Sequence, residues 1–219
     1  VGTVETWSTV PGAANPGMAH SVGNFVIGQG LGSNTYSVAA DTMNNLYVVD
    51  AGANSIIKID SAGGMSVFAT FPSLPQAGQE SVPTKIVTAS NGFYVCNLTG
   101  APCLSGAASL FHVDLAGTVT TVQNGLTTLV DVAVDPADGR PVVLSFGQFA
   151  GNVFLPNTGT ITKITATGTH TVASGLSHPG GMGYTSNGDL YVHSSSEGGL
   201  LRFGSGLNMA LTQGTGWLA

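Results

Sequence analysis

The sequence predicts an all-β fold: a β-propeller of about four four-stranded blades. Runs of β-branched and aromatic residues recur about every 48 residues, a period typical of propeller blades. Asn-Gly pairs, the strongest short signal for hairpin turns, recur at Asn91-Gly92, Asn124-Gly125 and Asn187-Gly188. Hydrophobic residues make up 42% of the chain and only 7% of residues are charged, which argues against a disordered low-complexity chain.

Each repeat contains four strand-like segments. The second has the strongest strand signal, at Leu46–Asp50, Phe93–Cys96, Pro141–Leu144 and Leu190–His193. A weaker strand precedes it at Tyr36–Ala40, Lys85–Thr88, Val130–Val134 and Gly181–Tyr184. A third strand, with apolar and polar residues alternating, follows at Ile56–Asp60, Leu110–Asp114, Ile161–Ile164 and Leu200–Phe203. The fourth is expected at Met65–Thr70, Val119–Gln123, His170–Ala173 and Met209–Thr212.

Residues 1–219 are therefore expected to form one propeller domain, with blades at about 36–70, 81–123, 127–173 and 178–213. No stretch has helix periodicity with caps, so no helix is expected. Gly2–Val10 reads as a lone fourth strand, and a connector rich in Gly and Pro follows it over 11–35. That strand either closes a ring with the last blade or is the remnant of an upstream blade. The four blades form either a small ring or an incomplete six-bladed one that another subunit completes.

Charge and hydropathy restrict the partners. A net charge of −6, with five Lys and Arg in total, argues against nucleic acid and against an anionic membrane surface. No apolar run approaches the roughly 20 residues of a membrane-spanning helix, so no membrane insertion is expected. The expected partners are other copies of the chain or surface proteins, with glycans as a further possibility. The chain starts at Val1 without a signal segment, which we interpret as a mature or truncated product.

The two cysteines, Cys96 and Cys103, lie close in sequence. We expect a disulfide between them in an oxidising compartment, with two unrelated thiols as the alternative. Asn97-Leu98-Thr99 is an N-glycosylation sequon in the same segment, which makes Asn97 a candidate glycosylation site.

Several segments resemble one known family, in the same order along the chain. Gly125–Asp135 resembles the family segment GLTNIVDVAFDPDG, and Asp50–Asn54 resembles its DAGGNDLLRVD segment. The other ordered matches are Ser81–Thr84, Asn97–Gly100, Gly106–Ser109 and Gly175–Gly181. The chain thus resembles the ScyD/ScyE family of NHL-like six-bladed propellers, over what corresponds to the C-terminal two-thirds of that family's domain.

The resemblance implies a propeller fold and a secreted, extracellular or periplasmic location, but no particular reaction. Two features depart from the family pattern. About two blades that the family has before this point are absent. Cys96 and Cys103 stand where the family has an acidic and an aromatic residue.

Propellers bind ligands at the channel mouth, on the loops that join the inner strands. The polar residues expected there are Asp50, Asn54, Asn97, Asp131, His178 and His193. Related propeller lactonases and hydrolases hold a divalent cation at this mouth, and Asp50, Asn54 and Asp131 offer the oxygen ligands that calcium prefers. The simpler interpretation is that Asp and Asn cap turns at strand ends. We therefore expect no cofactor and no fixed metal, with a divalent cation such as calcium as the alternative.

No short motif identifies a reaction. The five histidines lack zinc-site spacing, and no Gly-x-Ser-x-Gly elbow is present. The leading prediction is a non-catalytic extracellular interaction or structural module, such as a subunit of a filament. The alternative is a propeller enzyme, a metal-assisted hydrolase or lyase, acting on a small molecule at the channel mouth. A glycan-binding propeller is the third.

Overall fold

The computed structural model describes residues 5–7, 19–74, 79–196 and 198–204, and it confirms the predicted propeller-type fold. Three four-stranded antiparallel sheets and one three-stranded sheet follow one another along the chain. The first two blades consist of β3 (Thr35–Ala40), β4 (Leu46–Asp50), β5 (Ser55–Ile59) and β6 (Met65–Thr70), then β7 (Pro83–Ala89), β8 (Gly92–Asn97), β9 (Ala108–Asp114) and β10 (Val119–Leu126).

The third blade consists of β11 (Leu129–Val134), β12 (Pro141–Ser145), β15 (Gly159–Thr165) and β16 (Gly168–Leu176). A small hairpin that the sequence did not predict, β13 (Phe149–Ala150) and β14 (Val153–Phe154), lies between β12 and β15. The described part of the fourth blade is β17 (Pro179–Tyr184), β18 (Leu190–Ser194) and β19 (Gly199–Phe203). The fourth strand expected at Met209–Thr212 lies outside the described residues.

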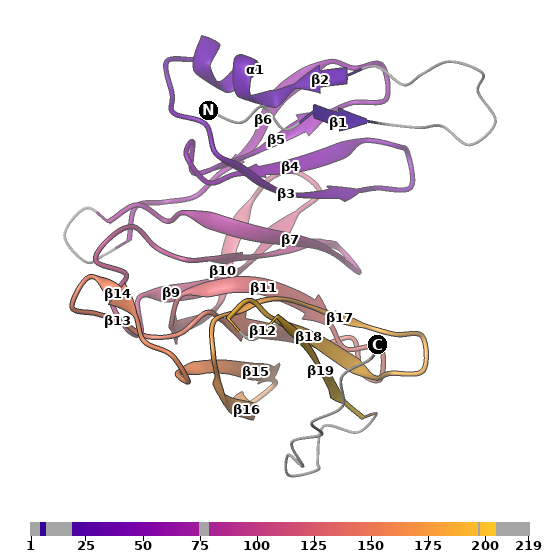
Figure 1. Cartoon of the computed structure of the whole chain (residues 1–219). Coiled ribbons are helices and arrows are strands. Elements are labelled where there is room, and N and C mark those ends of the chain that lie inside the picture. Colours follow the sequence, from indigo (N-terminus) through magenta and orange to yellow (C-terminus); the bar gives the residue numbers. More distant parts are fainter. Residues whose placement is uncertain (1–4, 8–18, 75–78, 197, 205–219) are drawn as a thin grey trace.

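The inner strands β3, β7, β11 and β17 each contact the next one, so the blades pack face to face in chain order (Figure 1). Alternation along each second strand divides its side chains between the two neighbouring blades. In blade 2, Phe93 and Val95 face blade 1, whereas Tyr94 and Cys96 face blade 3.

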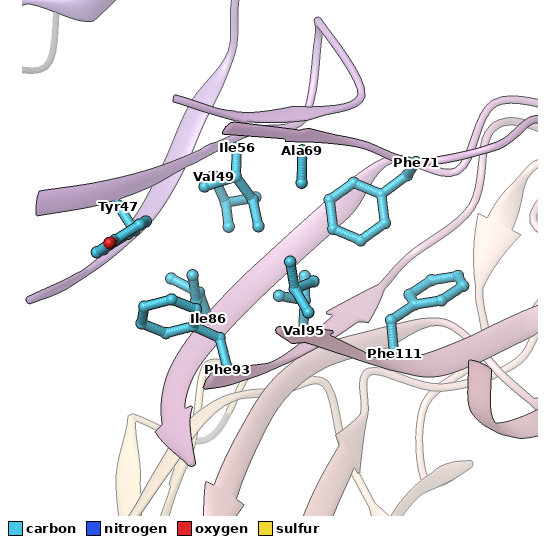
Figure 2. Packing of buried hydrophobic residues seen from close by; sticks show 10 residues of the cluster. Tyr47, Val49, Ile56, Ala69, Phe71, Ile86, Phe93, Val95 and Phe111 are labelled. Atoms are coloured by element: carbon cyan, nitrogen blue, oxygen red, sulfur yellow. The ribbon is translucent and has the colours of Figure 1, made fainter. Parts of the chain in front are cut away.

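Figure 2 shows the interface of blades 1 and 2, where aromatic and β-branched side chains from both sheets interdigitate. The Phe93 ring centroid lies 4.4 Å from that of Tyr47, and Phe71 and Phe111 pair at 5.3 Å. Both contacts cross from one blade to the next, so apolar burial holds the blades together.

One expectation for the N-terminal region is wrong. The predicted connector contains a helix, α1 (Val22–Gly28), although no helix was expected. Val22 and Val26, one helical turn apart, are buried against Val48 and Ile57 on the face of blade 1 that points away from blade 2. Figure 1 shows α1 covering this face, where a preceding blade would lie in a larger propeller.

The lone strand predicted at Gly2–Val10 does not join a blade in its described part. Residues Glu5–Trp7 form β1, which pairs with β2 (Ala19–Ser21) in a separate two-stranded sheet. The remainder of Gly2–Val10 lies outside the described residues. None of the helices in the described chain is long and apolar enough to cross a membrane.

Candidate functional site

Each inner strand has a β-bulge near its start, at the same position in all four blades. A bulge adds one residue on one strand and re-aims the side chains that follow it. The equivalent residues just after the extra one are Ser37, Lys85, Asp131 and Gly181. These residues, one from each blade, define the centre of the candidate site.

Side chains at this position link one blade to the next. The Ser37 Oγ accepts a hydrogen bond from the Ile86 amide at 3.4 Å, and the Asp131 Oδ2 accepts one from the Met182 amide at 2.7 Å. Between these two links, the Lys85 Nζ lies 3.6 Å from the Asp131 Oδ1. Asp131 therefore contacts blades 2 and 4 from its place on blade 3.

The Asp131 carboxyl is buried beside a cation. Its side chain is 6% exposed, and its Oδ1 also accepts a hydrogen bond from the Val132 amide at 2.8 Å. Burial raises the pKa of Asp131, although Lys85 and the two backbone donors act to lower it. Burial also raises the pKa of Tyr36 on blade 1, and negative charge on Asp131 adds to that effect. A carboxyl with a raised pKa beside a lysine is suited to proton transfer.

A second set of equivalent residues closes the mouth end of each blade, where the inner strand begins and the second strand ends. Each is the last residue of its second strand, is buried, and bonds to the segment before its own inner strand. We call them the mouth latches: Asp50 to Ser33 and Asn34, Asn97 to Ser81, Ser145 to Thr128, and Ser194 to Ser177. Asp50 and Asn97, expected at the mouth, thus serve the fold, as the turn-capping interpretation predicted.

The glycosylation prediction for Asn97 is wrong, because this side chain is fully buried. Its Nδ2 donates to the Ser81 carbonyl at 2.9 Å and to the Ser81 Oγ at 3.2 Å. Its Oδ1 accepts from the Ser109 amide at 2.7 Å. The folded blade leaves no room for a glycan on this nitrogen.

Asn54 and His178 also have structural partners. The Asn54 Oδ1 accepts from the Val82 amide at 2.7 Å, which ties blade 1 to blade 2. His178 has a positive φ of 47°, and its counterpart Val82 also has a positive φ, of 51°. Each residue lies immediately before the inner strand of its blade. The His178 Nε2 lies 3.1 Å from the Phe154 carbonyl, and its ring packs 5.2 Å from that of Phe146.

The expected cation ligands Asp50, Asn54 and Asp131 do not fit a shared cation. A calcium ion requires several converging oxygens that are free to bind it. The oxygens of all three residues instead accept hydrogen bonds from backbone amides. Among the described residues, no group of three or more His, Cys, Asp or Glu side chains is placed to hold a metal ion. We therefore assign no reaction step to a cation.

His193 is the second predicted residue that the structure brings to the centre of the site. It is exposed on β18, opposite Gly181 of β17. A Cβ on Gly181 would lie 3.4 Å from the Asp131 Oδ2, and one on Gly180 would lie 3.1 Å from the His193 Nδ1. Asp131 and His193 thus both border the Gly180–Gly181 pair, whereas Asp50, Asn54 and His178 do not take part.

Sequence reasoning missed Lys85 and Tyr36 as site residues. Both lie on inner strands, and neither belongs to a recognisable motif. One available signal was that Lys85 is the only Lys or Arg in any of the four predicted inner strands. The other blades have a small or acidic residue at this position, so a lysine there departs from the repeat.

The predicted disulfide is wrong, because both cysteines are free and buried. The Cys96 Sγ lies 3.3 Å from the Thr84 Oγ1, within the interface of blades 2 and 3, and burial raises its pKa to about 12. The Cys103 Sγ donates to the Thr99 carbonyl at 3.5 Å. The alternation of side chains along β8 directs Cys96 toward blade 3, where its Sγ contacts Thr84 and not Cys103.

No family model and no curated protein matches the sequence. Solved structures do match. A gluconolactonase from Xanthomonas campestris is 18% identical, with a TM-score of 0.56 over 80% of this chain and 60% of its own. A streptogramin B lyase is 16% identical, with a TM-score of 0.54 over 79% and 55%. Virginiamycin B lyase from Staphylococcus aureus is 14% identical, with a TM-score of 0.51 over 78% and 56%.

The chain has the β-propeller fold of these enzymes. It spans little more than half the length of the structures it matches. The leading prediction of a non-catalytic structural or interaction module is contradicted, because the matched structures are of propeller enzymes.

Proposed function

We propose that this chain forms part of a hydrolase or lyase that acts on a small molecule at the mouth end of its inner strands. The observation that carries the proposal is the Asp131 carboxyl, which is buried, paired with Lys85 at 3.6 Å, and has a raised pKa. General acid–base catalysis near neutral pH is most efficient when the pKa of the acid or base lies near the working pH, which for a carboxyl means a raised pKa. The enzymatic activities of the matched structures support the same proposal.

The residues of the site have distinct roles in this proposal. Asp131 transfers a proton to or from the substrate, since it is the buried carboxyl of the set. Lys85 stabilises the charged form of Asp131, because its positive charge lowers the carboxyl pKa that burial raises. Tyr36, half exposed on the inner strand of blade 1, offers a hydroxyl to the substrate.

The first test uses the two substrate types that the matched enzymes suggest, glucono-δ-lactone and virginiamycin B. Ring opening of each is followed with the purified protein, with and without added calcium. Asp131→Asn is expected to lower kcat by about 100-fold or more, because a positioned acid or base contributes 10²–10⁴-fold.

Asp138→Asn is the matched control, because Asp138 is an exposed carboxyl at the far end of β11 that pairs with Lys163 and Arg140. It is expected to leave kcat unchanged. Turnover that survives in a folded Asp131→Asn protein, or that falls equally in Asp138→Asn, contradicts the assignment of Asp131. No ring opening of either substrate by the wild-type chain contradicts the proposed substrates.

Membership of the ScyD/ScyE family and export from the cell belong to this same proposal. They are supported by the ordered segments, of which Gly125–Asp135 is the longest. A solved ScyD/ScyE structure is expected to show the same bulge in each inner strand and a glycine pair at the positions of Gly180 and Gly181. Localisation is tested by immunodetection of the protein in the medium and in cell fractions of the native source.

A further inference from the structure

Blade 4 departs from the other blades at three neighbouring positions. The first position is the extra residue of the bulge in the inner strand. The second is the residue of the second strand that comes just before the mouth latch, and the third is the residue just after the latch. In blades 1 to 3 these positions are Tyr36–Val49–Ala51, Thr84–Cys96–Leu98 and Val130–Leu144–Phe146. In blade 4 they are Gly180–His193–Ser195.

The equivalence of these positions rests on hydrogen bonds as well as on register. The Ser195 amide donates to the His178 carbonyl, as the Leu98 amide donates to the Val82 carbonyl. In blades 1 to 3 the second-strand residue of each set is Val, Cys or Leu and is fully buried in the contact with the next blade. In blade 4, the last blade that the structure describes, it is the imidazole of His193, which is exposed. Elsewhere this face of blade 4 keeps the repeat, since Tyr191 occupies the place of Tyr47. A local break in a packing pattern is where functional residues are expected.

The two polar side chains converge on the bare glycine. The point that a Cβ on Gly180 would occupy lies 2.7 Å from the Ser195 Oγ and 3.1 Å from the His193 Nδ1. A Cβ at position 180 would therefore force the Ser195 Oγ to shift and would crowd the His193 ring. Within the described part of the chain, neither the Ser195 hydroxyl nor the His193 ring has a hydrogen-bond partner.

We infer that Ser195 and His193 form a nucleophile and base pair for acyl transfer from an ester or lactone, an inference that rests on the proposed function. A hydroxyl is a weak nucleophile unless an adjacent base removes its proton. Apo structures hold such pairs more loosely than the reacting complex does. The pair lies beside Asp131, which borders the same glycine segment.

The reaction needs only water as a second reactant. The His193 Nδ1 takes the Ser195 proton as the Oγ forms a bond to the acyl carbon and the ester C–O bond breaks. The leaving oxygen takes a proton from the Asp131 carboxyl, and the imidazolium proton then restores that carboxyl. Water next attacks the acyl-serine with His193 again as base, the acyl–Oγ bond breaks, and the proton returns to Ser195 as the acid leaves.

The test is covalent labelling with an alkyl fluorophosphonate, in which a serine oxygen forms a bond to phosphorus as the P–F bond breaks. Intact-protein and peptide mass spectrometry are expected to place one adduct on Ser195 in the wild type and none in Ser195→Ala. Ser196→Ala is the matched control, because the Ser196 Oγ instead donates to the Ser177 carbonyl at 2.8 Å. It is expected to label at the wild-type rate.

Two further variants test the geometry. His193→Ala is expected to slow labelling by about 100-fold, the lower end of what a positioned base contributes. Gly180→Ala keeps both reactive groups but separates them, so labelling is expected to slow while the melting temperature changes little. Labelling of His193→Ala at the wild-type rate overturns the role of the imidazole.

Failure of this inference is distinguishable from failure of the proposed function. No adduct in the folded wild type, or an adduct that persists in Ser195→Ala, overturns the pair. Lactone turnover that survives in Ser195→Ala also overturns the pair while leaving the role of Asp131 intact. An adduct on Ser195 in a protein that opens no lactone supports the pair and contradicts the proposed substrates.

Discussion

Replacement of Asp50 by alanine separates the structural role of a mouth residue from a catalytic one. The Asp50 carboxylate is fully buried and accepts four hydrogen bonds. The Ser33 hydroxyl donates at 2.6 Å and the Asn34 amide at 2.8 Å, from the segment before β3. The Gly52 and Ala53 amides donate at 3.0 Å each, from the turn after β4. The variant therefore loosens both segments that meet at this end of blade 1.

The expected loss of stability follows from how far water can replace the carboxylate. A hydrogen bond to a charged group contributes about 1.5 to 3 kcal/mol, and an unsatisfied buried donor costs about 1 to 3 kcal/mol. Asn34 and Gly52 are exposed, so their amides regain water, whereas Ser33 and Ala53 are half-buried. We expect Asp50→Ala to lower the free energy of unfolding by about 3 kcal/mol. The melting temperature should fall by about 6 to 12 °C for a chain of this size.

Differential scanning calorimetry, with far-UV circular dichroism, measures this effect. Asp60→Ala is the matched control, because the Asp60 Oδ1 caps an exposed turn through the amides of Ala62 and Gly64. Its cost should stay under about 1 kcal/mol. A melting temperature of Asp50→Ala within 2 °C of that of Asp60→Ala, about the shift from 1 kcal/mol, would refute the assignment of Asp50 as a latch. Loss of turnover without loss of stability would identify it as a site residue instead.

Three further predictions follow from other parts of the structure. Lys85→Met removes the cation that lowers the pKa of Asp131, so the acidic limb of the kcat/KM profile should move to higher pH; a limb that stays in place contradicts this coupling. Thiol titration without reductant should find two free thiols in denaturant, and in the native protein Cys96 should resist alkylation because it is buried and has a pKa of about 12; a single intramolecular disulfide in the mass spectrum is the contrary result. Gly117→Ala should destabilise the protein more than Gly125→Ala, since a Cβ on Gly117 would lie 2.2 Å from a carbonyl of blade 1 and one on Gly125 meets nothing within 4 Å; equal melting temperatures would contradict the close approach.

The strands were predictable because their signals are local. The alternation in Ile56–Asp60 and the repeat spacing of Tyr47 and Tyr94 identify strands without knowledge of the tertiary fold. Helix α1 was missed because a seven-residue helix has room for only two buried positions, Val22 and Val26, which is too few to show a period. The hairpin of β13 and β14 was missed because two-residue strands carry no alternation.

The site was predictable only in part, because bulges decide which way a side chain points. Asp131 and His193 were both expected at the channel mouth, and the structure brings both to the Gly180–Gly181 pair. Lys85 faces Asp131 only because one extra residue precedes it in β7, and a shift of one residue reverses the facing of a strand. Side chains alternate between the two faces of β8, and this alternation points Cys96 into the interface with blade 3. The short sequence distance between Cys96 and Cys103 does not reveal that direction.

The mouth latches separate the geometry of the blades from the length of their loops. Each latch joins the end of a second strand to the segment before the inner strand of the same blade, so the two strand ends stay joined whatever the length of the loop that follows. That loop spans 51–54 in blade 1, 98–107 in blade 2 and 146–158 in blade 3, yet the latch persists in all three. Loops at this end can therefore differ in length while the sheets beneath them stay fixed. The latches make this end of the molecule the natural place to graft new binding segments onto an unchanged scaffold.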